Sequence, residues 1–154
     1  MMIEYRKATL DDSGELAKIR GLFLLEAHDI CSESEREAME TANKSYFETA
    51  LADDSFAAWL AVDSGKIIAT SGLSFFVVPP SFKCPDGRVY IMNMFTFPDY
   101  RRQGIGMELL KRTVEEAKNR GYKKITLHAT DIGKPLYQKY GFTDSHGDMV
   151  FYVQ

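Results

Sequence analysis

One segment combines glycines, basic side chains and a predicted helix start in an order that suits phosphate binding. Residues 88–97 are almost wholly apolar, which predicts a strand buried on both faces. Arg101 and Arg102 follow, and Gly104 and Gly106 open a predicted helix. Free amides at a helix start attract anions, and a glycine lets a phosphate come close to the backbone. The segment therefore predicts a pyrophosphate site.

Three known phosphate-binding patterns can be compared with this segment. The Walker loop needs GxxxxGK followed by Ser or Thr, and nothing in the sequence fits it. The dinucleotide fingerprint GxGxxG fits poorly, because Leu109 stands at its third glycine position and the preceding strand is not the first. The third pattern, (Gln/Arg)-x-x-Gly-x-(Gly/Ala) after a strand and a proline, is met completely by residues 101–106.

A second motif lies near the end of the chain. Residues 133–142 read Gly-Lys-Pro-Leu-Tyr-Gln-Lys-Tyr-Gly-Phe and contain a Leu-Tyr-x-x-x-Gly-Phe element. With both motifs in order on matching predicted elements, the chain resembles the GNAT family of acetyl-CoA-dependent N-acetyltransferases over nearly its whole length. The resemblance implies that the fourth and fifth strands splay into a V that holds acetyl-CoA as co-substrate, with no metal.

The resemblance also implies roles for residues of the first motif. Backbone groups of Met94, Phe95 and Thr96 would pair with the pantetheine arm and the thioester. A strand amide at Phe95 or Thr96 would stabilise the oxyanion that develops when an amine attacks the thioester. Thr130 would cap the last helix and reach the cofactor, although the family often has Asn there and Ala where Gly133 stands. The pyrophosphate would be held mostly by backbone amides, with Arg101 nearby, from Arg102, Gln103, Gly104, Ile105, Gly106 and Met107.

Tyr137 and His128 are the candidate catalytic residues. In the family, a tyrosine at the place of Tyr137 protonates the departing thiolate, and pKa values of about 10 for phenol and about 8.5 for thiol suit that transfer. Tyr140, one turn later, is expected to pack in the core. Asn93 replaces the strand glutamate that some members use as a base. His128, on the fifth predicted strand, is either a base or proton relay or a half-exposed strand residue.

The acceptor site, by the same resemblance, lies at the first two helices and their connection. Glu26 and His28 are candidates there, and Asn93 on the fourth strand is a candidate to orient the substrate. Acidic side chains cluster in residues 26–40, which would favour a cationic amine. Helix capping and helix-dipole complementation account better for the cluster as a whole.

Hydrophobic periodicity predicts the elements that position these residues. The predicted order β-α-α-β-β-β-α-β-α-β-β is an α/β fold of mixed α+β type with about four helices. The family resemblance implies a GNAT-like, mostly antiparallel sheet of six to seven strands. Residues 1–154 are expected to form one acetyltransferase domain. Capping boxes at Thr9–Asp12 and Ser34–Glu37 predict the first two helix starts. The other two helices are predicted at 104–120 and 131–140, and the strands at 2–8, 56–62, 67–78, 88–97, 123–130, 142–146 and 148–153.

Composition narrows the class of protein further. The 154 residues are 45% hydrophobic and 27% charged, which excludes a disordered chain or a collagen, and the net charge of −3 argues against nucleic-acid binding. No apolar run reaches the roughly 18 residues of a membrane span, and no secretory signal is visible, so a cytoplasmic protein is expected. Cys31 and Cys84 form no CxxC, and the histidines are scattered, which disfavours a metal site.

The predicted function is transfer of an acetyl group from acetyl-CoA directly to a primary amine of a small molecule or peptide. Neither cysteine lies in a nucleophile motif, which agrees with transfer without an acyl-enzyme. A catalytically silent acyl-CoA sensor or partner-binding module is the alternative, because the strand glutamate is missing. The identity of the acceptor and the formation of a homodimer are left open.

Overall fold

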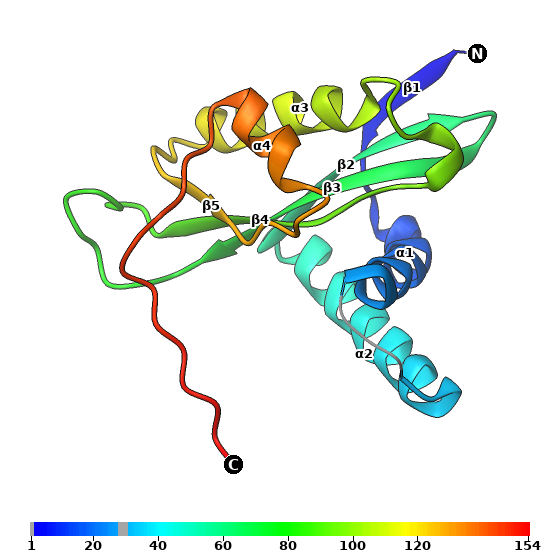
Figure 1. Ribbon diagram of the computed structural model, residues 1–154, viewed down its shortest axis with the longest axis horizontal. Coiled ribbons are helices and arrows are strands. Elements are labelled where there is room, and N and C mark those ends of the chain that lie inside the picture. Colours follow the sequence, from blue (N-terminus) through cyan, green and yellow to red (C-terminus); the bar gives the residue numbers. More distant parts are fainter. Residues whose placement is uncertain (1, 28–30) are drawn as a thin grey trace.

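The computed structural model describes residues 2–27 and 31–154, and in them a five-stranded mixed sheet carries four α-helices (Figure 1). Short 3-10 turns precede the first and third helices. The helices are α1 (Ser13–Ala27), α2 (Glu33–Ala52), α3 (Ile105–Asn119) and α4 (Lys134–Tyr140). The strands are β1 (Ile3–Lys7), β2 (Phe56–Asp63), β3 (Lys66–Phe76), β4 (Arg88–Thr96) and β5 (Ile125–Leu127).

The sheet has the order β1-β2-β3-β4-β5, and only its last pair is parallel. Strand β4 pairs with β3 to its end, where Thr96 lies opposite Ala69. It pairs with β5 over three residues, Val89–Ile91. Beyond Ile91 the two strands part, so the V expected between the fourth and fifth strands is present.

Helices cover the two faces of the sheet separately. Helices α1 and α2 lie on one face and α3 and α4 on the other (Figure 1). Leu16, Phe47 and Phe56 belong to the core under α1 and α2, whereas Leu110 and Val89 belong to the core under α3. The sheet is thus buried on both faces along β3, which explains why that strand does not alternate in polarity.

Reciprocal side-chain caps start the first two helical segments. The amide of Thr9 donates to Asp12 at 2.7 Å, so the first predicted capping box is confirmed. The second box lies two residues earlier than predicted. The amide of Ser32 donates to Glu35 at 2.7 Å, and the amide of Glu35 donates back to Ser32 Oγ at 3.2 Å, because α2 begins at Glu33.

The predicted closing hairpin at 142–146 and 148–153 is wrong, and the sheet has five strands rather than six to seven. Residues 141–154 form no strand, and the last part of the chain leaves the body of the molecule (Figure 1). The β-forming side chains of residues 148–153 do not by themselves make a strand, because a strand needs a hydrogen-bonding neighbour. The fifth strand is also shorter than 123–130, so His128 follows its end.

Candidate active site

The start of α3 leaves backbone amides without partners inside the helix. Its N-cap is Gly104, whose φ of +81° is left-handed, and it makes no side-chain cap. The first intrahelical bond is donated by Glu108 to the carbonyl of Gly104, at 3.1 Å. The N–H groups of the first turn before it have no acceptor one turn earlier in this helix. Arg102, with φ of +63°, also adopts the left-handed conformation, which is uncommon for a non-glycine residue.

Gly106 lies where α3, the end of β4 and α4 converge. A Cβ atom on it would stand 3.4 Å from Leu136 Cδ2 and 3.9 Å from both Met94 Cε and Thr96 Oγ1. A side chain there would therefore fill the space in front of the free amides. The bare backbone, the helix dipole and the free amides fit a pyrophosphate group.

The end of β4 presents backbone groups to the open side of the V. Phe97 donates its N–H to Ile68 of β3 at 3.0 Å. Since successive amides of a strand point to opposite edges, the N–H and C=O of Thr96 point away from β3. The Thr96 carbonyl is indeed reached from that side by Arg101 Nε, at 2.8 Å. Of the two predicted oxyanion donors, Phe95 and Thr96, this geometry favours Thr96.

A β-bulge at Asn93 interrupts the strand just before this edge. The register of β3 and β4 shifts between Thr70 and Gly72, and Asn93 has φ of +54°. Thr70 Oγ1 donates to the Asn93 carbonyl at 2.6 Å. The Asn93 side chain is 1% exposed, and neither its nitrogen nor its oxygen has a partner among the described residues. A buried amide without partners costs about 1–3 kcal/mol, so a missing partner is expected here; contact with the acceptor stays a prediction.

Tyr137 is almost fully buried in the middle of α4, with 9% of its surface exposed. Its ring packs edge-on against Phe142, with centroids 6.0 Å apart. Burial, with a smaller contribution from Tyr90, raises the pKa of Tyr137 to about 12. The phenol is therefore protonated at neutral pH, as a proton donor must be.

Tyr90 of β4 is a neighbour of Tyr137 that the sequence analysis did not single out. Burial raises its pKa, and the backbone N–H of His128 partly offsets the rise. A tyrosine in an otherwise apolar strand was the available signal. Tyr90 therefore belongs to the electrostatic surroundings of Tyr137, whose pKa it raises slightly.

Thr130 and Gly133 are in direct contact. Gly133 donates its N–H to Thr130 Oγ1 at 3.1 Å, so the Thr130 hydroxyl binds the residue immediately before α4. A Cβ on Gly133 would stand 3.3 Å from that hydroxyl and 3.2 Å from Tyr137 Cε2. Thr130, where the family often has Asn, and Gly133, where it often has Ala, are therefore neighbours whose side-chain sizes affect one another. A contact of Thr130 with the cofactor stays a prediction.

Arg101 and Glu26, predicted for different ligands, bind each other. Arg101 Nη2 lies 2.6 Å from Glu26 Oε2, while its guanidinium stacks over the Phe95 ring at 5.5 Å. The pair joins the last turn of α1 to the end of β4. Arg102 is exposed and forms no ion pair with any residue in 2–27 or 31–154, so its charge is available to an anion.

The remaining predicted site residues differ in their hydrogen bonds and in how far they are buried. Gln103 Nε2 donates to the Asp99 carbonyl at 3.1 Å, which leaves its backbone for a ligand. Ile105 is buried beneath α3, and Met107 is half-buried in its first turn. His128 is exposed beyond the end of β5. His28 lies outside the described residues.

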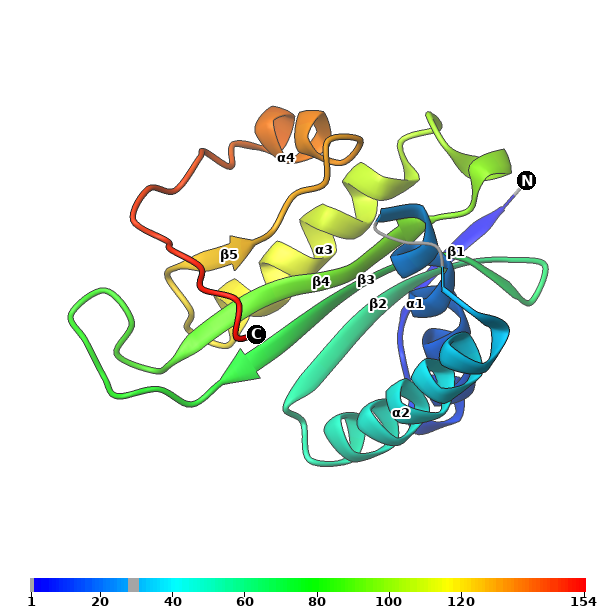
Figure 2. The ribbon, with the colours of Figure 1, turned by 60° about the horizontal axis from the view of Figure 1, so that its bottom comes forward.

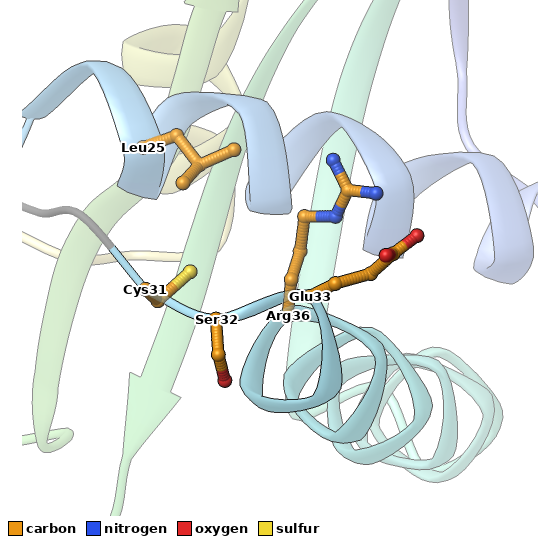
Figure 3. A pocket seen from close by; sticks show the side chains of 5 residues that line it. All are labelled: Leu25, Cys31, Ser32, Glu33 and Arg36. Carbon is orange, nitrogen blue, oxygen red and sulfur yellow. The ribbon is translucent and has the colours of Figure 1, made fainter.

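A shallow cavity of about 310 Å³ lies between α1 and α2, in the region where the acceptor site was expected. Leu25 reaches it from the end of α1, and the other lining residues come from the start of α2 (Figure 3). They are Cys31, Ser32, Glu33 and Arg36. One acid of the predicted acidic cluster, Glu35, is occupied in capping, which agrees with the structural explanation of that part of the cluster.

Within residues 2–27 and 31–154, no three His, Cys, Asp or Glu side chains gather as metal ligands. In the same part of the chain, no helix is both long enough and apolar enough to cross a membrane.

Comparison with known proteins agrees with this geometry. The chain is 34% identical to a predicted acetyltransferase from Clostridium acetobutylicum solved with acetyl-CoA, with a TM-score of 0.89 over 98% of this chain and 96% of that one. A GCN5-related N-acetyltransferase from Ralstonia eutropha is 30% identical, with a TM-score of 0.88 over 99% of both chains.

Curated relatives match a smaller share of the chain and are longer. A mouse thialysine N-epsilon-acetyltransferase is 31% identical over 56% of this chain and 53% of its own length. A probable N-acetyltransferase, camello, of Xenopus laevis is 27% identical over 81% of this chain and 53% of its own length. The chain spans about half the length of these relatives. The model of the acetyltransferase (GNAT) family matches residues 20–142, and the chain therefore belongs to the GNAT family of acetyl-CoA-dependent N-acetyltransferases.

Proposed function

We propose that the protein transfers the acetyl group of acetyl-CoA directly to a primary amine, with both molecules bound together on one domain formed by residues 1–154. The observation that carries this proposal is the uncapped start of α3 facing the splayed end of β4, with bare Gly106 between them. When bound, acetyl-CoA supplies an acyl group activated as a thioester. The remaining chemistry belongs to the residues of the chain.

Backbone groups bind and orient the cofactor in this proposal. The amides of Gly104, Ile105 and Gly106 hold the pyrophosphate, where the α3 dipole adds about half a positive charge. The exposed Arg102 side chain adds a full charge at the mouth. The amide of Thr96 holds the thioester oxygen as negative charge grows on it, which favours the transition state over the ground state.

The Tyr137 hydroxyl donates a hydrogen bond to the thioester sulfur as it leaves. Its pKa of about 12 keeps the phenol protonated throughout the neutral range. Complete transfer of its proton to a thiolate, whose conjugate acid has a pKa of about 8.5, is uphill. The phenol therefore stabilises the leaving sulfur and passes its proton on only as the proton of the attacking amine replaces it.

The amine itself must lose a proton before it attacks. His128 is the proposed relay, because it is exposed just beyond the end of β5 and an imidazole can both accept and donate a proton. The proposed acceptor is a cationic primary amine of a small molecule or peptide. The name of the mouse relative, thialysine N-epsilon-acetyltransferase, gives the epsilon nitrogen of thialysine as its acceptor. A cytoplasmic location stays a prediction.

The experiment is a thiol-release assay with acetyl-CoA and a panel of small-molecule, polyamine and peptide amines. Wild type is compared with Tyr137→Phe, and Tyr140→Phe is the matched control, since Tyr140 is on the same helix. Turnover on one class of amine that falls with Tyr137→Phe and not with Tyr140→Phe supports the proposal. Tight acetyl-CoA binding without thiol release on any amine would favour the silent acyl-CoA sensor instead.

A further inference from the structure

One arginine of α1 carries a charge that no carboxylate in the described part of the chain pairs with. The arginines that form ion pairs are Arg6, Arg101, Arg112 and Arg120. Three others form none with residues 2–27 or 31–154 and are exposed to water: Arg36, Arg88 and Arg102. Arg20 likewise forms none, but its side chain is half-buried. It is therefore the one arginine of this part of the chain that loses water without gaining an acid.

The surroundings of Arg20 make its charge unfavourable. Burial lowers the pKa of Arg20, and nearby Tyr46 partly offsets this effect. An arginine is not deprotonated in proteins, so the charge persists. The side chains one turn away on α1 are all apolar, namely Leu16, Ala17, Phe23 and Leu24. Since a buried charge is stable when it is paired, an anion supplied by a ligand is the expected partner.

Tyr46 of α2, the neighbour of Arg20, is fixed in place and still accessible. Helices α1 and α2 lie together on one face of the sheet (Figure 2). The Tyr46 hydroxyl lies 3.2 Å from Ser74 Oγ on β3. Its ring packs edge-on against Phe47 and Phe56, with centroids 5.4 and 6.1 Å apart. Because Tyr46 remains 43% exposed, a ligand can reach this position beside the guanidinium.

The same face of the sheet connects Tyr46 with the proposed site of transfer. Ser74 lies directly opposite Tyr90 of β4, so their side chains share one face of the sheet. Tyr90 in turn belongs to the surroundings of Tyr137, the proposed donor to the leaving sulfur. A line of neighbouring side chains thus leads from Arg20 towards the reacting end of the cofactor.

We propose that Arg20 binds a carboxylate of the acceptor, and that the acceptor is therefore an ω-amino acid, with a primary amine at one end and a carboxylate at the other. One guanidinium matches the single charge of a carboxylate, and its paired N–H groups match the two oxygens. The bound carboxylate orients the amine towards the thioester. The inference rests on the proposed function for the transfer itself, and Arg20 takes no part in moving protons.

Thiol release tests the proposal with β-alanine, γ-aminobutyrate and ε-aminocaproate, each compared with its primary amide. The amide has the same length but no negative charge. Wild type is expected to prefer at least one acid over its amide by at least roughly 10-fold in kcat/KM, the effect of a charge-assisted hydrogen bond. Arg20→Gln should remove this preference by raising the KM for the acid, with the amide unaffected. Arg20→Lys, which keeps the charge but not the paired donors, should retain part of it.

Lys18→Gln is the matched control, because it removes one positive charge from an exposed position of the same helix. It should keep the full preference for the acid. Circular dichroism verifies that each variant is folded. A preference that persists in Arg20→Gln, or that is lost equally in Lys18→Gln, overturns the inference.

Binding separates failure of this inference from failure of the proposed function. Calorimetric titration of the same acids and amides, with CoA present, measures the preference without turnover. Tighter binding of an acid that is lost in Arg20→Gln supports the inference even if no amine releases thiol. Turnover on amines with equal kcat/KM and equal affinity for acids and amides overturns it, and leaves the proposed function standing. Failure of every acid to bind overturns it as well.

Discussion

The starts of α2 and α3 are built in opposite ways. Helix α2 satisfies its own first amides, because Ser32 and Glu35 bind each other's backbone N–H groups. Helix α3 begins at Ile105, its N-cap Gly104 provides no side-chain cap, and Arg102 stands two residues before that glycine. The free amides and the dipole are neutralised internally in α2 and left available in α3.

This difference shows how one secondary structure serves two purposes. The reciprocal cap of α2 contributes stability to the protein in the absence of any ligand. The start of α3 lacks this stabilising cap, and its free amides gain a binding partner when an anion binds. The acidic start of α2 repels anions, so the two helices of one fold divide stability and cofactor binding between them.

The largest expected effect is at the α3 start. In Gly106→Val, a side chain fills the space before the free amides, where a Cβ is already 3.4 Å from Leu136. Acetyl-CoA affinity should fall at least roughly 100-fold, since two charge-assisted hydrogen bonds of about 1.5–3 kcal/mol each are lost. Isothermal titration calorimetry measures this. Gly21→Val on α1, where a Cβ would meet nothing within 4 Å, is the control. Equal affinity in both variants would remove Gly106 from the cofactor site.

Tyr137→Phe separates chemistry from binding at the same end of the molecule. Turnover should fall roughly 10- to 1,000-fold, the range for one proton donor, while acetyl-CoA affinity changes little. Because the pKa of Tyr137 is raised to about 12, its ionisation should contribute no alkaline limb to the pH–rate profile below about pH 11. A wild-type limb near pH 10 that disappears in the variant would contradict this environment.

Asp12 caps the first helical segment from within the protein, as Glu35 does for α2. Arg6 binds its carboxylate through two hydrogen bonds, of 2.8 and 2.9 Å, and holds the pKa of Asp12 below its usual range. The resulting stability is present above the unfolded pKa of about 3.9 and is lost as pH falls through the lower folded value. Asp12→Asn should cost about 1.5–3 kcal/mol of unfolding free energy at pH 7 and progressively less below pH 4. Urea titrations across this range measure the difference, and a constant difference would be the contrary result.

Ser32→Ala sharpens the contrast between α2 and α3 directly. Loss of the N-cap should lower the free energy of unfolding by about 0.5–2 kcal/mol. Acetyl-CoA affinity should be unchanged, because the start of α2 is proposed to bind no part of it. Thermal unfolding and calorimetry on one preparation give both quantities. A lower acetyl-CoA affinity of Ser32→Ala with an unchanged free energy of unfolding would mean that the two helix starts are not independent.

The smallest effect is expected for Glu26→Gln. Its partner Arg101 keeps the hydrogen bond to the Thr96 carbonyl, and exposed ion pairs contribute about 0–1 kcal/mol. Acetyl-CoA affinity and acceptor KM should each change by less than about fivefold. A KM for the amine raised tenfold or more, with unchanged acetyl-CoA affinity, would instead return Glu26 to the acceptor site.

The sequence predicted best what neighbouring residues decide. Residues 101–106 place glycines and charges in one loop, and local rules for strand ends and helix starts were enough to identify it. The splay of β4 from β5 agrees with what the family resemblance implied. Even the capping box at α2 was missed by only two residues, since Ser32 and Ser34 both precede a glutamate by three positions.

What the sequence could not predict depends on residues far apart in the chain. Glu26 and Arg101 were assigned to two ligands, and only folding brings α1 to the end of β4, where they pair. Residues 148–153 are rich in β-forming side chains, but that composition does not say which strand they would pair with. The predicted closing hairpin around Gly147 is therefore wrong, since no described strand of the chain pairs with these residues.

The most direct test of the central claim uses a ligand that lacks the pyrophosphate and leaves the protein unchanged. Calorimetric titrations would compare acetyl-CoA with S-acetylpantetheine, which has the thioester and pantetheine arm but no pyrophosphate. If the amides at the start of α3 hold the pyrophosphate, wild type should bind acetyl-CoA at least roughly 100-fold more tightly, and Gly106→Val should bind the two ligands alike. Equal affinity of the wild type for both ligands would contradict the account.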